Sequence, residues 1–221
     1  MKSILTSELP RHQLYRVLTG FVAPRPIAMV SSRSVTGVLN IAPFSFFNVV
    51  STDPPMLGVS IGKRFGRQTK DTLKNVRAAK GFIVNIVNES EVTAMNVCSL
   101  DWTPDVDEFT ASKLTPARDS RVIDIPRIAE APVAMECSLH RVLHLGSYAL
   151  VIGKVEAFHI DERFVDAEYH VDFERYRPIG RLAGDDYCRT SDRMTVPREA
   201  DTPREAVRDG GGLMRRPVRG E

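Results

Sequence analysis

The 221-residue sequence predicts a mainly β protein with a few helices, in which antiparallel strands close into a barrel. Short apolar runs recur along the chain, several alternate with polar residues, and turn-forming residues separate them. Helical spacing is only intermittent, which disfavours a doubly wound parallel sheet. Hydrophobic residues make up 43% and charged residues 26%, a balance typical of a folded domain rather than a disordered chain.

The strands are predicted from apolar runs and from the turns that separate them. Gly37 provides a turn for an early hairpin, and Asp53-Pro54-Pro55 separates the following pair of runs. The predicted strands cover residues 26–32, 38–42, 46–50, 56–61, 82–87, 133–143 and 148–160.

The last two runs predict a long, half-buried hairpin that turns at Gly146 and Ser147. The predicted inner face of its first strand carries Val133, Met135, Cys137, Leu139 and Leu143, and the opposite face carries Glu136, Ser138 and His140.

Two helices are predicted within the same body. One spans residues 70–79, with Leu73 and Val76 facing inward and Gly81 ending it. The other spans residues 89–98, with Asn88 as N-cap and Glu91 as its capping-box partner.

Composition divides the chain into three zones. Residues 1–20 are predicted to be an N-terminal lead-in, with a short helix capped by Ser7 and ended by Gly20. Residues 21–196 form the single domain. Residues 197–221 are charged and contain three prolines and a Gly triplet, so we expect a flexible tail.

Charge and cysteine content exclude several function classes. A net charge of +2 gives no reason to expect a nucleic acid or an anionic membrane as partner. The three cysteines are far apart in sequence, which disfavours a disulfide framework or a zinc site and fits a reducing compartment. No run is long enough for a signal peptide or a membrane span, so we expect a cytoplasmic protein.

Metal and Rossmann-type sites are not indicated. His140 and His144 would lie roughly 13 Å apart along a strand, too far to share a metal. The acidic stretch from Asp101 to Glu108 lacks the glycine of a calcium loop, and a solvated loop is the favoured interpretation. No Gly-x-Gly-x-x-Gly fingerprint occurs.

One basic segment conflicts with the helix that it precedes. Four cations, Lys63, Arg64, Arg67 and Lys70, lead into the start of the helix at residues 70–79, where the helix dipole disfavours positive charge. A bound phosphate would resolve this conflict, with Lys70 and the hydroxyl of Thr69 or Thr72 as its ligands. A solvated loop with a Thr69 or Asp71 cap is the alternative.

A second segment, from Asn40 to Asn48, mixes small, polar and aromatic residues without clean amphipathicity. Such a strand edge could present backbone groups and a ring to a planar heterocycle. A core strand with capping asparagines explains the same pattern.

These segments, taken with others, resemble the flavin reductase-like family, which includes the flavoredoxins and the reductase components of two-component monooxygenases. The resemblance extends over about residues 14–197. It is carried by residues 24–31, 37–48, 53–56, 70–75, 82–85, 131–137, 151–155, 159 and 178–182. It implies an FMN-binding split β-barrel of antiparallel Greek-key type, forming a homodimer with the flavin near the subunit interface.

The resemblance also implies roles for particular residues. Lys70 and Thr72, together with Lys63 of the basic segment, would hold the FMN phosphate, and Ser60 would reach the ribityl chain. His159 is the predicted catalytic residue beside the flavin and the nicotinamide, although a hydrogen-bonded barrel histidine is the alternative. Tyr187 would cover the flavin ring, which would be bordered by Asn40, Ser45, Phe46, Phe47 and Asn48.

The function that follows is hydride transfer from NADH or NADPH to FMN (or FAD), and onward to an acceptor such as a monooxygenase. A flavoredoxin-type electron carrier, reduced by a protein partner and not itself catalytic, is the alternative. A relative of the pyridoxamine-phosphate oxidases on the same barrel fits the motifs less well.

Overall fold

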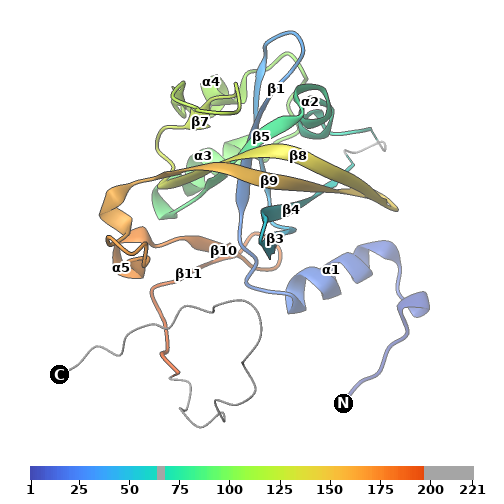
Figure 1. Cartoon of the computed structure of the whole chain (residues 1–221). Coiled ribbons are helices and arrows are strands. Elements are labelled where there is room, and N and C mark those ends of the chain that lie inside the picture. Colours follow the sequence, from blue (N-terminus) through green and yellow to red (C-terminus); the bar gives the residue numbers. More distant parts are fainter. Residues whose placement is uncertain (64–67, 197–221) are drawn as a thin grey trace, which may run out of the picture.

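A seven-stranded antiparallel sheet dominates the computed structural model, which describes residues 1–63 and 68–196 (Figure 1). Its strands follow the order β2-β1-β5-β8-β9-β4-β3. Only Ser45 and Phe46 join the two edge strands, β2 and β3, so the edges are drawn together and the sheet curls into the predicted barrel. The strands are β1 Ala28–Arg33, β2 Leu39–Phe44, β3 Phe47–Thr52, β4 Pro55–Gly62, β5 Gly81–Ile86, β8 Val133–Leu145 and β9 Tyr148–Ile160.

The β8–β9 hairpin confirms the predicted long hairpin and corrects two of its details. A register shift between Leu139 and Arg141 leaves His140 as an extra residue, so Leu143 no longer shares the face of Leu139 and is 39% exposed. Glu136 lies on the outer face as expected, yet it is fully buried, because residues 121–123 cover it.

The helices are α1 Arg11–Phe21, α2 Asp71–Ala79, α3 Val92–Cys98, α4 Glu108–Ser112 and α5 Phe173–Tyr176. Leu73 and Val76 of α2 point inward, as predicted. The helix ends at Lys80 in a left-handed conformation (φ 55°), whereas the predicted stop, Gly81, already begins β5. Asn88 and Glu91 form the predicted capping box at the 3₁₀ turn Glu89–Glu91 that leads into α3.

Two local predictions were wrong. The N-terminal helix begins after Pro10 rather than at Ser7, which lies in the 3₁₀ turn Thr6–Glu8, and Gly20 lies inside the helix. The acidic stretch is not simply a solvated loop, because Asp107 caps α4 and Glu108 is buried.

The hydrophobic core has two main layers. The barrel interior is filled from the sheet and from α2, while a second cluster lies between the outer face of β1 and β2 and the helices α3 and α4. The second layer holds α3 over the sheet, and its buried members are Ile27, Met29, Leu39, Ile41, Val87, Met95, Cys98, Phe109, Leu114, Ile128 and Ile179.

Two small two-stranded sheets complete the fold. One pairs β6 Pro116–Ala117 with β7 Arg127–Ile128, and the other pairs β10 Ile179–Arg181 with β11 Tyr187–Arg189. A bridge between Arg25 and Arg181 attaches the second to the chain that leads into β1. Arg64, Arg67 and the predicted tail at residues 197–221 lie outside the described residues.

Candidate functional site

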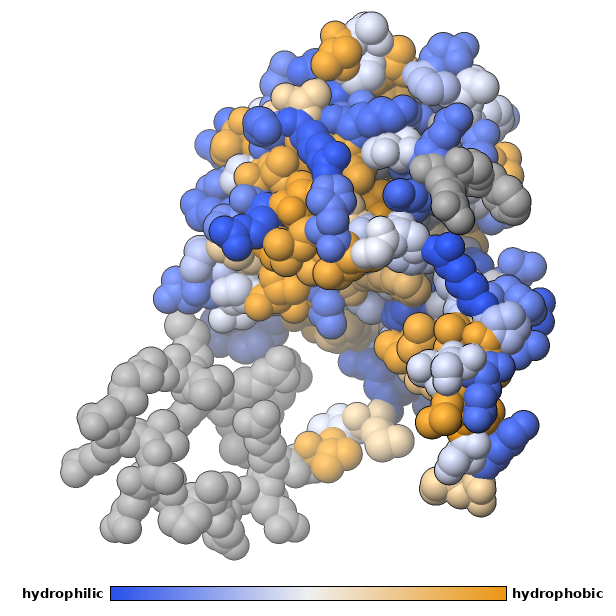
Figure 2. Space-filling view, turned by 90° about the vertical axis from the view of Figure 1, so that its right-hand side faces the viewer, coloured by the Kyte–Doolittle hydropathy of each residue, from blue (hydrophilic) through white to orange (hydrophobic). Residues whose placement is uncertain are grey.

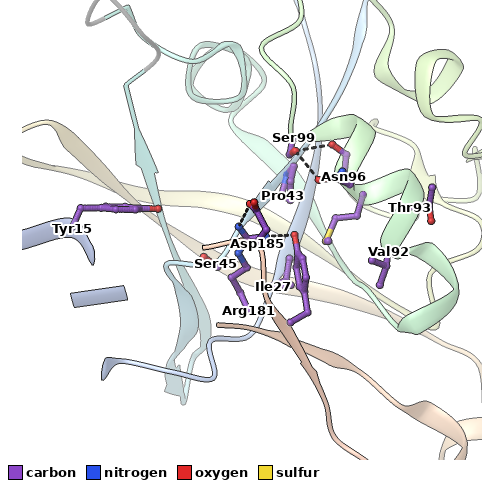
Figure 3. A pocket seen from close by; sticks show the side chains of 12 residues that line it. Tyr15, Ile27, Pro43, Ser45, Val92, Thr93, Asn96, Ser99, Arg181 and Asp185 are labelled. Carbon is purple, nitrogen blue, oxygen red and sulfur yellow. Dashed lines mark hydrogen bonds and ion pairs between the residues drawn. The ribbon is translucent and has the colours of Figure 1, made fainter. Parts of the chain in front are cut away.

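A cleft of about 840 Å³ opens between α3 and the β10–β11 sheet, at the end of β2 (Figure 3). This volume lies within the range of sites that hold small molecules or cofactors. The cleft is lined by Tyr15, Ile27, Pro43, Ser45, Val92, Thr93, Met95, Asn96, Ser99, Arg181, Asp185 and Tyr187.

The α3 wall presents neutral hydrogen-bonding groups. Thr93, Asn96 and Ser99 follow one another at intervals of three residues, so they share one face of the helix and its C-terminal end. The Ser99 hydroxyl donates to the carbonyl of Asn96 at 2.6 Å. Val92 and Met95 add apolar surface to the same wall.

The opposite wall carries the charge of the cleft. The Arg181 guanidinium lies 4.5 Å from the ring centroid of Tyr187 and donates to the hydroxyl of that residue. It also donates to the carbonyl of Gly184 and lies 3.8 Å from the Asp185 carboxylate. The turn that connects the two strands therefore positions the guanidinium at the cleft.

A buried arginine connects this wall to α1 and to the residue that follows β2. Arg25 is 7% exposed and donates to the carbonyl oxygens of Thr19, Val22 and Leu182. Its Nε lies 3.4 Å from the Ser45 hydroxyl oxygen. Arg25 thereby holds Ser45 at the cleft, although the sequence suggested no role for Arg25 beyond its place in segment 24–31 of the family resemblance.

The aromatic residues of the segment from Asn40 to Asn48 lie in different surroundings. The Phe46 ring lies between Tyr15 and Tyr148, with centroid distances of 6.4 and 5.6 Å. Phe47 packs against the barrel core, whereas Asn48 is exposed and its side chain accepts from the N–H of Val49.

Ser60 lies across from this segment and is half-buried. Its backbone N–H donates to the Phe46 carbonyl at 2.8 Å. Of the residues predicted to border a flavin ring, only Ser45 and Tyr187 line the cleft.

Asn40 and Thr72 meet in a buried polar network. The Thr72 hydroxyl, on a residue only 1% exposed, donates to the Asn40 side-chain oxygen at 2.9 Å. The same oxygen accepts from Ser32, and the Asn40 amide donates to the buried carboxylate of Glu108. Both predicted binding residues are thus brought together, with each other as hydrogen-bonding partners.

Lys63, Lys70 and Thr72, the predicted phosphate ligands, are not among the residues that line the cleft. Lys70 is the N-cap of α2, and its side chain makes no capping hydrogen bond. Its ammonium lies 3.8 Å from Asp101, two residues beyond the cleft-lining Ser99. Lys63 is exposed and pairs through its backbone with Thr69.

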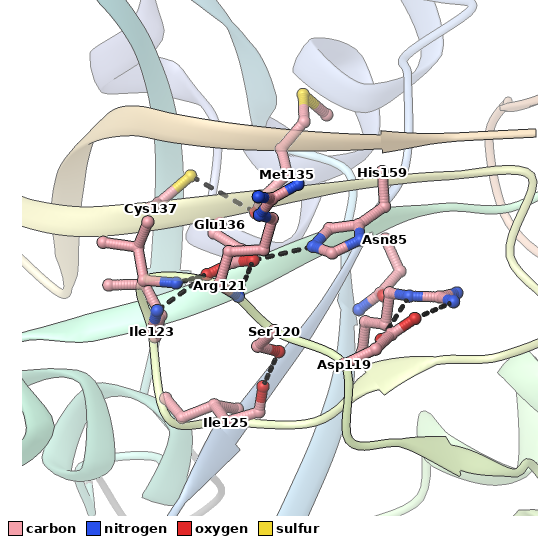
Figure 4. Close-up of polar contacts among 12 residues, drawn as sticks. Asn85, Asp119, Ser120, Arg121, Ile123, Ile125, Met135, Glu136, Cys137 and His159 are labelled. Carbon is pink, nitrogen blue, oxygen red and sulfur yellow. Dashed lines mark hydrogen bonds and ion pairs between the residues drawn. The ribbon is translucent and has the colours of Figure 1, made fainter.

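His159 does not line the cleft. Its Nε2 lies 2.7 Å from the carboxylate of Glu136, which also accepts the backbone N–H groups of Arg121, Val122 and Ile123 (Figure 4). Burial alone would raise the pKa of Glu136, but these hydrogen bonds hold it below its usual value. The histidine has a structural partner here, and its catalytic role stays a prediction.

Among the described residues, no group of three or more His, Cys, Asp or Glu is arranged to hold a metal ion. No helix of residues 1–63 and 68–196 has the length and apolarity needed to cross a bilayer.

The fold is a split β-barrel whose cleft has a volume suited to a small organic molecule, and comparison with known proteins identifies the family. A family model described as the flavin reductase like domain matches residues 21–180. An uncharacterized protein of Aquifex aeolicus is 41% identical over 176 residues, covering 80% of this chain and 89% of its own.

Two solved structures are similar along nearly their whole length. Nitrilotriacetate monooxygenase component B from Bacillus cereus is 37% identical with a TM-score of 0.85, covering 89% of this chain and 98% of that one. The 2-nitrobenzoate 2-nitroreductase NbaA from Pseudomonas fluorescens is 35% identical with a TM-score of 0.82, covering 91% and 98%. The chain belongs to the flavin reductase-like family.

The residues of the cleft fit a flavin. Tyr15, Pro43 and Met95 offer apolar and aromatic surface to a planar ring system. The hydroxyl and amide groups along α3 match the polyhydroxylated chain that follows that ring. The start of α2, with the Lys70 ammonium beside it, is a suitable place for a terminal phosphate. The sequence suggested no role for the α3 residues, because their spacing is that of any half-exposed helix.

Proposed function

We propose that this protein is an FMN-dependent oxidoreductase that takes hydride from NADH or NADPH and passes the electrons to an acceptor. The observation that carries the proposal is the cleft itself, which combines an apolar wall with a row of neutral hydrogen-bonding groups in a chain of the flavin reductase-like family. The flavin supplies the redox chemistry when it is bound.

The protein's own residues would bind and orient the cofactor. The phosphate would lie at the start of α2 beside Lys70, and the ring would lie along Ser45, where Arg25 fixes the hydroxyl. Tyr187 would contact the ring from the β11 side, since Arg181 holds its hydroxyl in place. Hydride transfer to a flavin needs no side-chain nucleophile.

Flavin binding tests the proposal directly. The purified protein should show the two visible absorbance bands of a flavin, or should acquire them with FMN. We expect Lys70→Ala to lower FMN affinity about ten- to a hundred-fold, the effect of losing one charge-assisted contact. Riboflavin, which has no phosphate, should bind both forms alike.

Lys74→Ala is the matched control. Lys74 lies one turn further along α2, and its ammonium is paired with the Asp71 carboxylate at 2.9 Å. Lys74→Ala therefore removes a neighbouring lysine whose charge already has a close acidic partner, and FMN affinity should change little. Equal affinity of FMN and riboflavin for the unaltered protein would contradict the phosphate assignment.

The electron donor separates the enzyme from the carrier. If the protein is the enzyme, NADH or NADPH alone should rapidly bleach the absorbance of its flavin, which a stopped-flow measurement would show. A flavoredoxin-type carrier would stay oxidised until a donor protein was added. The similarity to a monooxygenase component B makes a separate monooxygenase one candidate acceptor.

A second candidate is direct reduction of a small aromatic acceptor at the flavin. It is favoured by the 35% identity with a 2-nitrobenzoate 2-nitroreductase along 91% of this chain. Consumption of NAD(P)H that requires a nitroaromatic compound and leaves no diffusible reduced flavin would support it.

We further propose a cytoplasmic homodimer. Apolar side chains gather on the face of the molecule in Figure 2, and α1 exposes Tyr15, Val17, Leu18 and Phe21. A second copy of the chain would cover this surface.

A further inference from the structure

The charge of Arg181 is the feature of the cleft that the proposed flavin contacts leave unexplained. Its side chain is 26% exposed and lines the cleft. A guanidinium has five N–H donors, and within the described part of the chain two of them have hydrogen-bond acceptors, the Tyr187 hydroxyl and the Gly184 carbonyl. Donors therefore remain for a ligand.

The nearby acid provides only partial compensation for this charge. Asp185 lies 3.8 Å from the guanidinium, beyond hydrogen-bonding distance, and its side chain is fully exposed. An ion pair of this kind contributes little to stability. A ligand carboxylate could take its place without loss of any strong internal contact.

Tyr187 adds a second donor at the same position. Because its hydroxyl accepts a hydrogen bond from Arg181, the hydroxyl hydrogen is directed elsewhere and can be donated to an anion. The Arg181 side chain also stacks over the Tyr187 ring at 4.5 Å, which fixes the fork of N–H groups. Two neighbouring residues thus form a pre-organised site for one carboxylate.

The rest of the cleft indicates what such a carboxylate is attached to. Ile27 and Val92, which also line the cleft and are not among the residues assigned to the flavin ring, are apolar. These surfaces suit a planar apolar body rather than a flexible polar chain.

We propose that Arg181 and Tyr187 form a carboxylate subsite and that the cleft accepts a planar aromatic acid beside the flavin. The proposal rests on the proposed function, since it names the class of the second ligand of that same cleft. The guanidinium pairs with the carboxylate, the Tyr187 hydroxyl donates to it, and the aromatic ring lies in the apolar part of the cleft.

Benzoate and its neutral isostere benzamide test this subsite. Their affinities for the protein, with and without FMN, can be measured by calorimetry. We expect benzoate to bind more tightly than benzamide, and Arg181→Gln to weaken benzoate about ten- to a hundred-fold while benzamide changes less than about twofold. Arg163→Gln, which removes a 78% exposed arginine outside the cleft, should change neither.

Asp185→Asn tests the same subsite from the opposite direction. Removing the competing carboxylate should strengthen benzoate binding about two- to fivefold and leave benzamide unchanged, given the small energy of an exposed pair. This position is fully exposed, so the variant should fold even if Arg181→Gln destabilises the β10–β11 turn.

Three outcomes would overturn the proposal. Equal affinities of benzoate and benzamide, or equal losses of both in Arg181→Gln, would show that no carboxylate is recognised. If Arg181→Gln lowered the affinity for FMN and left that for riboflavin unchanged, Arg181 would belong to the binding site of the flavin phosphate instead. Failure of the unaltered protein to bind FMN would contradict the proposed function, whereas the benzoate comparison without flavin would still decide the subsite.

Discussion

Glu136 shows how a single buried acid can organise a surface segment of this protein. Its carboxylate accepts three backbone N–H groups at 2.7 Å each from residues 121–123, and the His159 ring lies at the same distance. A fully buried carboxylate is tolerated because all of these donors face it. The segment is therefore held to the β8–β9 hairpin by polar contacts to one side chain.

We expect stability to depend on the ionisation of Glu136. Its pKa is lowered in the folded protein from a usual value of 4.5. The charged form therefore contributes stability above about pH 4.5, and this contribution is lost as the pH falls through the lower, folded-state pKa. Urea unfolding between pH 3 and 8 should show this loss on the acid side.

Glu136→Gln should remove part of that acid dependence and cost about 3 kcal/mol near pH 7, because an amide nitrogen would face buried N–H donors. Other acids with lowered pKa values, such as Asp161 and Asp166, will keep some slope in the variant. A variant as stable as the parent at pH 7 would contradict this role.

Thr72→Val separates a structural role from a role in phosphate binding. The hydroxyl hydrogen is already donated to Asn40, so the variant should lose about 1 kcal/mol of unfolding free energy. FMN affinity should change less than about threefold, unlike that of Lys70→Ala. If FMN binding fell much further while riboflavin binding did not, the hydroxyl would belong to the phosphate site.

At the scale of elements, two glycines with opposite surroundings test how tightly the barrel is packed. A Cβ at Gly153 of β9 would lie 2.5 Å from the Phe82 ring inside the barrel. A Cβ at Gly20 of α1 would meet nothing within 4 Å. The first glycine gives space to a core ring, whereas the second has no such role in the described structure.

Gly153→Ala should therefore destabilise the protein by about 1–3 kcal/mol through overpacking. Gly20→Ala should stabilise it by up to about 1 kcal/mol, because alanine favours a helix more than glycine does. Chemical denaturation of both variants compares them directly. An unchanged midpoint for Gly153→Ala would mean that the Phe82 ring has room to move aside.

At the scale of the whole molecule, α1 is the element least explained by a single chain. Thr19 is its one buried residue among those described, while Leu18 and Phe21 are 61% and 87% exposed. Figure 1 shows the helix lying to one side of the barrel, beneath β3 and β4. A helix with so much apolar exposure is expected to have a partner surface.

We expect the protein to sediment as a dimer of its 24.7 kDa chain at micromolar concentration. Phe21→Asp should shift the equilibrium toward the monomer by placing a charge in the apolar contact. Val35→Asp, at a position 88% exposed on the β1–β2 turn, is the control and should leave the dimer intact. A monomeric parent would contradict the proposal.

Local periodicity was sufficient to predict most of the barrel. Alternation along residues 133–160 identified the long hairpin, and the Asn88 and Glu91 pair located the start of the helical segment that contains α3. Helix capping and strand alternation depend on residues only a few positions apart, so a short stretch of sequence is enough to recognise them. The run of cations at residues 63–70 predicted an anion site from the sequence alone, and that site stays a prediction.

The cleft depended on contacts that no local pattern contains. Ser45, the α3 residues and Arg181 are far apart in sequence. Arg25 joins the segments of Ser45 and Arg181 through the Ser45 hydroxyl and the Leu182 carbonyl, a group that any residue could supply. The burial of Glu136 and Glu108 was missed for the same reason. Both were predicted on solvent-facing segments, and both are buried because other segments cover them. Sequence spacing determined which face a side chain occupies, whereas only tertiary packing decided what lies against that face, because burial depends on elements distant along the chain.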